Sequence, residues 1–374
     1  MTGLFTNTIA ESTSGSGITF SNDIVPATPL SHRNMIINGG MIIDQRNSGS
    51  AVSPSNGAYT IDRLQTYQAG GGAFSVQQQS TVVPVGFSYS AKINVDTIDS
   101  SIASGDYYML TYNFEGYDTA HLEFGNSNAK TVTLSFYVRS SITGTFGGSI
   151  TNNAGDRSYP FEYTINSADT WERKTITFQG DQTGTWPKAV NTKSIKIRLA
   201  IAMGSTYTAS ANSWGSGDKY SSSNQVNLMA TQNNTFYITG VQLELGSVAT
   251  PFEFKSFGEE LRRCQRYYWK ITGNLYQQFA IYHRFNTSNH VFPIHLPVPL
   301  RHHQPTINQA NLGRWSHPAG SWSTSYTTVS FYDTIDSENN FTLVPFQMTG
   351  SSSEDTGLMG FQANGYLSLD AELA

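Results

Sequence analysis

The stretch that decides the fold is Thr131-Val132-Thr133-Leu134-Ser135-Phe136-Tyr137-Val138. Apolar side chains alternate with polar ones, so Val132, Leu134, Phe136 and Val138 share one face of an extended chain. An amphipathic helix would instead repeat its apolar positions every three or four residues. The stretch therefore predicts a β-strand with one face in a core.

The same alternation recurs on both sides of this stretch. Residues 194–202 place four apolar side chains inward and Lys196 and Arg198 outward, and residues 91–95 repeat the pattern more briefly. Turn-rich breaks separate such runs, at residues 144–148, 152–156 and 213–223. Many alternating strands without intervening helices predict an all-β chain with an antiparallel β-sandwich of the jelly-roll type.

One strand changes the parity of its apolar positions. Phe236 and Ile238 share one face, whereas Val241, Leu243 and Leu245 share the other, with Gly240 between the two sets. We expect a β-bulge at this glycine, because an extra residue re-aims the strand.

Composition agrees with a β-rich protein. Charged residues are 13% of the 374 residues and aromatic residues are also 13%, and long exposed helices need more charge than this. The net charge of -5 gives no basic surface for nucleic acid. The single Cys264 excludes an intramolecular disulfide. No apolar run approaches the roughly 18 residues of a membrane span, and no signal peptide is evident, so we expect a soluble protein made in the cytosol.

The length predicts more than one domain. Residues 1–33 are rich in Ser and Gly and form either a flexible tail or a segment that orders only within an assembly. We assign 34–255 to the jelly roll, 256–270 to a helix capped by Ser256 and Glu259, and 271–374 to a second, smaller β domain. The helix carries Phe257, Leu261, Cys264 and Tyr268 at helical spacing. Alternation in 367–373 predicts a final strand that is paired, because an unpaired terminal strand would fray.

Catalytic motifs are absent. The sequence has no Gly-x-Ser-x-Gly elbow, no Walker loop and no His-Glu-x-x-His, so we expect no enzymatic activity. Six of the eight histidines fall between His283 and His317. They are either surface and loop side chains or metal ligands. Cys264 is expected to be a buried small hydrophobe rather than a nucleophile.

Aromatic residues in polar loops are the candidate ligand-binding residues. Such rings either stack on a sugar ring or cover the loop's own core or a subunit interface. The candidates are Trp214, in a loop of the sandwich, and Trp315, Trp322, Tyr326 and Tyr332 in the C-terminal domain.

Two sets of motifs resemble a known family. The first comprises Asn34-Met35-Ile36-Ile37-Asn38-Gly39-Gly40-Met41, Asp44-Gln45-Arg46 and Tyr59-Thr60-Ile61-Asp62-Arg63. The second comprises Phe236-Tyr237-Ile238-Thr239-Gly240-Val241-Gln242-Leu243-Glu244-Leu245-Gly246, Thr250-Pro251-Phe252-Glu253 and Gly258-Glu259-Glu260-Leu261-Arg262-Arg263-Cys264-Gln265-Arg266-Tyr267-Tyr268. They are similar to the opening and the close of one module in tail-fibre and appendage proteins of bacteriophages. Residues 13–20 also resemble Ser-Gly-rich strands near the start of trimeric phage fibres.

The resemblance implies a jelly roll similar to carbohydrate-binding modules, on a virion appendage that is usually a homotrimer. Such modules often hold a structural calcium ion. This chain has Gly39-Gly40 where relatives often carry Gly-Asp, so it lacks a carboxylate that could bind a cation at that position. We expect a protein of the phage particle surface, made in the host bacterial cytoplasm, with residues 1–33 attached to other virion proteins.

Three functions remain open at this point. The chain binds a bacterial surface glycan, or it is a purely structural fibre, collar or head-decoration protein, or, third, it is a polysaccharide depolymerase. Sugar-cleaving tailspikes commonly have long repeat-built β-helices, and no repeat occurs here. For glycan binding we expect the site in the C-terminal domain, because the end opposite the attachment segment would lie farthest out.

Overall fold

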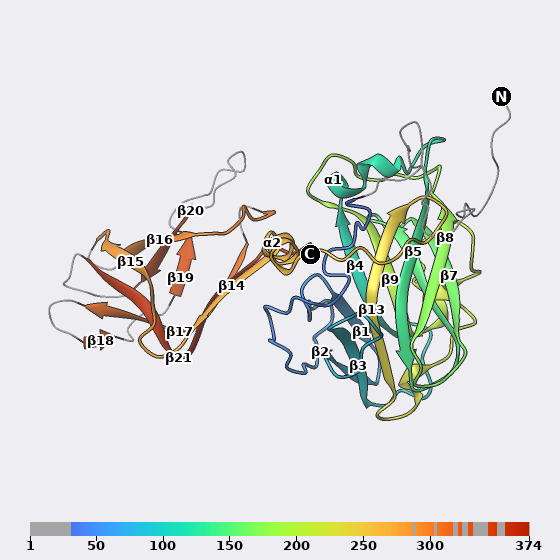
Figure 1. The fold of residues 1–374 in the computed structure, drawn as a ribbon, viewed down its shortest axis with the longest axis horizontal. Helices are drawn as coiled ribbons and strands as arrows, with labels where there is room; N and C mark the ends of the chain where they lie inside the picture. Colours follow the sequence, from blue (N-terminus) through green and yellow to red (C-terminus); the bar gives the residue numbers. More distant parts are fainter. Residues whose placement is uncertain are drawn as a thin grey trace, which may run out of the picture.

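The computed structural model describes residues 31–286, 289–302, 305–316, 321–323, 328–331, 343–349 and 356–373. They form two all-β units, a β-sandwich and a smaller β unit, with a short helix between them (Figure 1). The expected all-β class is confirmed. No helix in the described ranges is long and apolar enough to cross a membrane.

The sandwich consists of two antiparallel sheets that face one another (Figure 1). The six-stranded sheet has the order β1 (Gln65–Ala69), β4 (Tyr107–Glu115), β9 (Lys193–Met203), β6 (Gly144–Asn152), β7 (Arg157–Ile165) and β11 (Gly215–Ser216). The five-stranded sheet has the order β2 (Ala73–Gln79), β3 (Ser90–Thr97), β13 (Thr235–Leu245), β5 (Thr131–Ser140) and β8 (Glu172–Gln179). Apart from the consecutive pairs β2–β3 and β6–β7, neighbouring strands are not consecutive in sequence, as in a jelly roll.

The alternating residues of the sequence fill the space between the two sheets. Val132, Leu134, Phe136 and Val138 of β5 are fully buried in one core cluster with the apolar residues of β9. Arg198 points to the outer face of β9, as expected, but it is not in solvent. Its guanidinium pairs with Asp218 at 2.8 Å and lies 4.2 Å from the ring of Tyr220, because the loop after β9 folds back over the sheet.

The predicted bulge lies in β13. The pairing of β13 with β5 shifts register between Thr239 and Gln242, and Gly240 has φ of 62°. Only glycine adopts this backbone conformation at low cost. The bulge keeps both apolar sets of the strand in the core although their parity differs.

The helix α2 (Phe257–Gln265) is shorter than the predicted 256–270. Its N-cap is confirmed, because Ser256 Oγ accepts a hydrogen bond from Glu259 N at 3.2 Å. Cys264 is buried as predicted, but Phe257 is exposed. Tyr268 pairs with Asp370 in a strand ladder, so β-pairing replaces the helix from that residue onward.

The second unit is one antiparallel sheet built around the long strand β21 (Thr356–Asp370). Strand β17 pairs along one edge of β21, and β14 and β15 pair in succession along the other. The remaining strands extend the sheet on both sides. Their bounds are β14 (Tyr268–Gly273), β15 (Gln278–Arg284), β16 (Asn289–His295), β17 (Thr306–Ser316), β18 (Ser321–Ser323), β19 (Thr328–Phe331) and β20 (Leu343–Thr349).

The last described residues return to the junction of the two units, beside α2 (Figure 1). Arg46 Nη1 lies 2.7 Å from Asp370 Oδ2, and Tyr59 donates to the carbonyl of Leu373 at 2.9 Å. Arg301 donates to the carbonyls of Ala371 and Glu372 at 2.7 and 2.9 Å. The final strand β21 is paired along both edges, as predicted, but it ends at Asp370 rather than at residue 373. β21 runs back to the sandwich, so the last described residues lie at the junction of the two units. The expected outward position of the C-terminal unit stays a prediction.

Candidate ligand-binding groove

Trp214, the predicted ligand-binding residue of the sandwich, is half-buried. Its Nε1 donates to the carbonyl of Gln179 at 2.8 Å. Its ring has edge-on or tilted contacts, at centroid distances of 5.3 to 6.2 Å, with Phe124, Tyr159, Phe178 and Trp186. These contacts correspond to the alternative that Trp214 covers the core of its own loop.

The predicted site in the C-terminal unit is described only in part. Trp315 of β17 and Trp322 of β18 are directly opposite one another in an antiparallel pair. Strand β18 lies at the end of this unit away from the sandwich (Figure 1). Tyr326 and Tyr332 lie outside the described residues. A ligand-binding role for these four aromatic residues stays a prediction.

The structure has an open groove that the sequence did not predict, on the outer face of the five-stranded sheet. Its volume is about 660 Å³. Its floor is a row of three side chains on neighbouring strands, since Lys92 of β3 is in register with Gln77 of β2 and with Tyr237 of β13. Neighbouring strands lie about 4.8 Å apart, so the three side chains are adjacent.

The wall of the groove is held by glutamine side chains. Gln79 Oε1 accepts hydrogen bonds from the backbone of Thr81 and Val82 at 2.9 and 2.8 Å, which fixes the turn after β2. Gln77 Nε2 donates to the carbonyl of Gly49 at 3.0 Å and ties the opposite rim to the sheet. The wall is thus positioned before any ligand arrives.

The aromatic part of the groove is also held in place. Tyr237 is 7% exposed, with the Trp171 ring edge-on at 6.3 Å and the Arg139 guanidinium 5.3 Å from its centroid. Tyr89, which is half-buried, lines the same groove. Among the described residues, neither tyrosine hydroxyl forms a hydrogen bond. Both hydroxyls are therefore available to donate to a ligand and to accept from it.

A sequence signal for this groove existed. Three glutamines in succession, Gln77 to Gln79, follow an apolar residue that alternation places in the core. Lys92 lies between Ala91 and Ile93, which alternation also places in the core. What the sequence could not supply is the pairing of β3 with β13, which comes from a distant part of the chain.

The outer face of the six-stranded sheet carries a tyrosine cluster, but its rings are occupied. Tyr207 and Tyr220 stack at 4.4 Å, and Tyr107 stands edge-on to both. Arg198 covers the other face of Tyr220. Burial, together with the neighbouring Arg198, lowers the pKa of Lys196 to about 8. The rings of this cluster are thus packed against one another and against Arg198.

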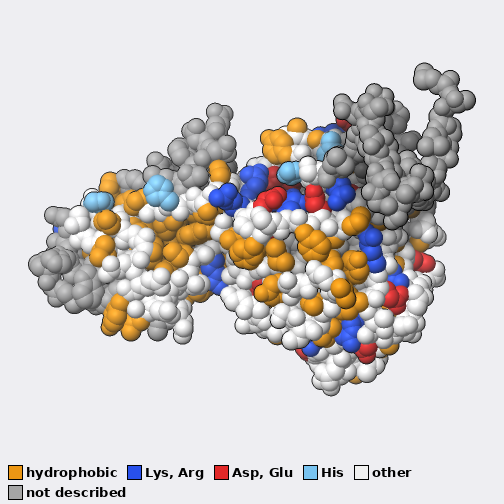
Figure 2. Space-filling model, viewed as in Figure 1, with side chains coloured by type: hydrophobic (Ala, Val, Ile, Leu, Met, Phe, Trp, Pro, Cys, Tyr) orange, Lys and Arg blue, Asp and Glu red, His pale blue; other side chains and the backbone are white. Residues whose placement is uncertain are grey.

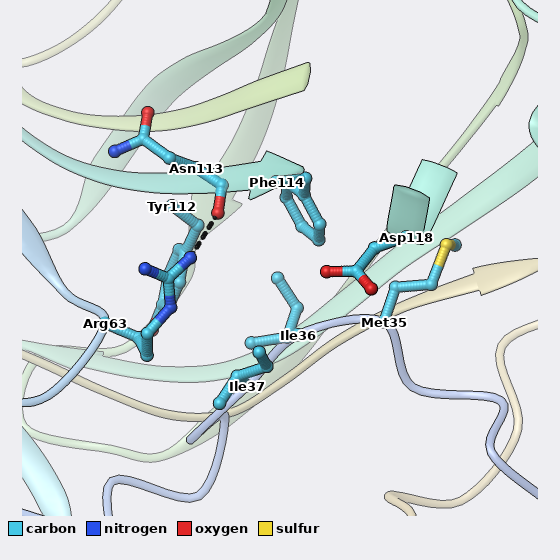
Figure 3. Close-up of a pocket in the computed structure, with 8 residues that line it drawn as sticks. All are labelled: Met35, Ile36, Ile37, Arg63, Tyr112, Asn113, Phe114 and Asp118. Carbon is cyan, nitrogen blue, oxygen red and sulfur yellow. Dashed lines mark hydrogen bonds between the residues drawn. The ribbon is translucent and has the colours of Figure 1, made fainter. Parts of the chain in front are cut away.

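A second hollow, drawn in Figure 3, is very small. It lies between residues 35–37 and β4, with a volume of about 10 Å³, which is the size of one water molecule. Arg63 Nη2 donates to the carbonyl of Asn113 at 2.7 Å across it. We assign this hollow to the packing of the sandwich rather than to ligand binding.

The two sets of family-like motifs meet at one end of the sandwich, although about 200 residues separate them. Asn34 Nδ2 donates to the carbonyl of Val241 at 3.1 Å, and Glu253 Oε2 accepts from Asn34 N at 2.8 Å. Asn38 Nδ2 donates to the carbonyls of Ile43 and Asp62 at 2.8 and 2.9 Å. Hydrogen bonds between the two sets of motifs therefore join the beginning of the sandwich to its last strand and to the segment after that strand.

The carboxylates around Gly39 and Gly40 already have protein partners. Asp44 accepts from the backbone of Asn47 and Gly49 at 3.0 and 2.8 Å, and Glu260 accepts from Asn38 N. Burial raises the pKa of Asp62 to about 7, against the influence of Arg46. In the described part of the chain no three His, Cys, Asp or Glu side chains are grouped to hold a metal ion. The residues present do not fit a calcium site here.

The clustered histidines of the C-terminal unit differ from one another. His283 and His295 are exposed, as the surface interpretation predicts. His290 is fully buried and stands edge-on to the ring of Tyr282, with 5.1 Å between the ring centroids. It is a core residue of this unit.

Comparison with known proteins gives similarity to solved structures only. No family model and no curated protein matches the chain. A tailspike protein 4 enzymatically active domain of Bacteriophage CBA120 is 14% identical, with a TM-score of 0.30 over 57% of this chain and 21% of that domain. A family 11 carbohydrate-binding module of Clostridium thermocellum, in complex with a mixed-linked tetrasaccharide, is 11% identical, with a TM-score of 0.27 over 54% of this chain and 98% of the module. TmCBM61 in complex with β-1,4-galactotriose is 12% identical, with a TM-score of 0.28 over 57% and 99%. The chain thus spans about a fifth of the tailspike domain.

Proposed function

We propose that this chain binds a bacterial surface glycan, through the groove over β2, β3 and β13. The observation that carries the proposal is the open, pre-positioned groove with its row of Gln77, Lys92 and Tyr237. A saccharide presents many hydroxyl groups around an apolar ring. Amide, ammonium and phenol groups hydrogen-bond such hydroxyls, while aromatic rings contact the apolar faces.

We further propose that the chain is a non-enzymatic appendage protein on the surface of a phage particle. The support is the resemblance of residues 34–63 and 236–268 to phage tail-fibre and appendage modules. In this proposal the chain is a homotrimer, and residues 1–33 bind other virion proteins. A mostly uncharged surface, largely white in Figure 2, suits a protein that meets a bacterial exterior.

The hairpin of Trp315 and Trp322 is the second candidate for the glycan site. The observation in its favour is the register pairing of these two residues at the end of the unit away from the sandwich. We prefer the groove because hydrogen bonds of Gln77 and Gln79 hold its walls in place before a ligand arrives.

The experiment is glycan-array binding by the purified full chain, followed by affinity measurements on the best ligand. Tyr89→Phe and Tyr237→Phe remove only a hydroxyl each and should weaken binding up to about 10-fold, because a neutral hydrogen bond contributes about 0.5–1.5 kcal/mol. Ser75→Ala, on the same face but outside the groove, should change nothing. The combined Ala variant of Trp315, Trp322 and Tyr326 tests the second site.

Each alternative function has its own outcome. Absence of binding to any glycan by the folded chain would overturn the proposal and leave the structural role. Release of reducing ends from host polysaccharide would show a depolymerase instead. Loss of binding only in the Trp315, Trp322 and Tyr326 variant would move the site to the C-terminal unit.

A further inference from the structure

We infer that the glycan of this groove is acidic and that its anionic group, a carboxylate, phosphate or sulfate, pairs with Lys92. This inference rests on the proposed function, because it names the chemical class of the ligand for the same groove. It is carried by the charges of the groove and by the partners of the basic residues around it.

The lining of the groove is positive in a protein that is negative overall. Eleven residues line it, and they include one lysine and no Asp, Glu or Arg. The whole chain carries a formal net charge of -5. A bound ligand displaces part of the water around the lysine of the groove. An ammonium group that loses water without gaining a counter-charge costs free energy, so an anionic ligand suits this groove better than a neutral one.

Lys92 stands out among the basic residues of this sheet face. Arg139, on the same face, pairs with Asp169 at 3.0 Å. Arg173 donates to the carbonyl of Thr250. Lys174, on β8 of the same sheet, pairs with Glu172 at 2.6 Å. Among the described residues Lys92 has neither an ion-pair partner nor a hydrogen-bond partner, so all three of its N–H donors are available.

The position of Lys92 fits an anion held against a sugar ring. Its stem is half-buried between Gln77 and Tyr237, its register partners on the two neighbouring strands. The register therefore places Lys92 between a phenol and an amide side chain on the same face of the sheet. When the anionic group of a saccharide pairs with the ammonium of Lys92, the rest of the saccharide lies among the hydroxyl and amide side chains that line the groove. A charge-assisted hydrogen bond is about twice as strong as a neutral one, so this contact would dominate selectivity.

The test compares binding of polygalacturonate with binding of neutral galactan, measured by calorimetry on the full chain. Lys92→Met removes the charge and keeps the stem, and Lys92→Arg keeps the charge. Lys130→Met is the matched control, because Lys130 is exposed, outside the groove and also without an ion pair. Array hits that carry phosphate or sulfate are measured in the same way, which distinguishes the sources of the anion.

The expected result is tighter binding of the acidic glycan by wild type, by about 10-fold or more. Lys92→Met should abolish that preference and leave neutral binding unchanged, whereas Lys92→Arg and Lys130→Met retain it. Raising NaCl from 50 to 500 mM should weaken acidic binding in wild type but not in Lys92→Met. The melting temperature of each variant shows that it is folded.

Two different failures are distinguishable. If wild type binds neutral and acidic glycans equally well and Lys92→Met changes neither, the inference is wrong and the proposed function stands. If the folded wild-type chain binds no glycan of either class, the proposed function fails and the inference with it. Acidic binding that survives in Lys92→Met would place the anion contact elsewhere and overturn the inference.

Discussion

At the scale of single residues, the buried ion pair of Arg63 with Glu372 holds the two units together. Both side chains are 4% exposed. The Arg63 guanidinium lies 3.5 Å from the centroid of the Tyr267 ring and donates to Asn113. Although burial acts to lower it, Glu372 keeps the pKa of Arg63 above its usual range. Removal of Glu372 leaves the Arg63 charge buried with no other ion-pair partner among the described residues, whereas removal of Arg63 leaves Glu372 paired with Arg46 at 3.2 Å.

We therefore predict that Glu372→Met, which leaves the buried Arg63 without an anionic partner, lowers the free energy of unfolding by about 3–5 kcal/mol. The measurement is urea denaturation at 25 °C, followed by fluorescence. The double variant Arg63→Met with Glu372→Met should recover most of the loss, because no unpaired charge remains. A loss below about 1 kcal/mol in the single variant would contradict the structure, since that is the value of an exposed pair.

Glu253 gives a prediction on acid stability. Burial acts to raise its pKa, but Lys255 and the backbone N–H groups of Asn34 and Arg33 outweigh burial and lower it to about 2. The folded pKa is thus below the unfolded value of 4.5. The ionised carboxylate stabilises the fold above that value, and its contribution is lost as the pH falls from about 4.5 to about 2.

The check is a comparison of wild type with Glu253→Gln. Wild type should be the more stable protein at pH 6, and the difference should shrink steadily towards pH 2. A difference that is constant over this range would show that Glu253 has the same pKa in the folded and the unfolded protein, and the predicted lowering would be wrong.

At the scale of elements, Gly240 sets the course of β13. A Cβ at this position would lie 2.7 Å from Phe87 Cζ and 2.9 Å from Tyr137 Cδ2, in addition to the cost of φ at 62°. Gly240→Ala should therefore cost at least about 1–2 kcal/mol and lower the melting temperature by several degrees. Gly258→Ala, in α2 and with nothing within 4 Å of the new Cβ, is the control and should be neutral or slightly stabilising. Equal stability of both variants would argue against the bulge.

The elements were predictable where a local pattern determines them. Alternation identified β5, β9 and β3, the parity change identified the bulge, and Ser256 marked the start of α2. The end of α2 was not predictable, because the pairing of Tyr268 with β21 is set by a strand almost one hundred residues later. The groove was missed for the same reason. Its row of Gln77, Lys92 and Tyr237 exists only after the distant strand β13 pairs with β3, the neighbour of β2. Loop aromatics such as Trp214 are visible in the sequence but pack internally.

At the scale of the whole molecule, we predict three-fold assembly. The Ser-Gly-rich segment and the resemblance to trimeric phage fibres motivate it. Light scattering at micromolar concentration should give three times the 41.0 kDa of one chain.

A chain that lacks residues 1–33 should stay folded and soluble but no longer enter particles. A 41.0 kDa monomer in the first experiment, or normal incorporation in the second, would count against this assignment.

The junction has a mechanical consequence. Two bodies joined by a single stretch of chain swing about it, and a force on one is absorbed as rotation of the linker. Here the chain crosses once through α2, and a second connection runs through residues 370–373 to Arg46, Tyr59 and Arg63. Charged side chains gather near this seam in Figure 2. Two separate attachments resist torque. A force applied at the far end of the C-terminal unit would therefore be transmitted to the sandwich through both attachments at the junction. The two units would then move together as one rigid body rather than rotate about a flexible linker.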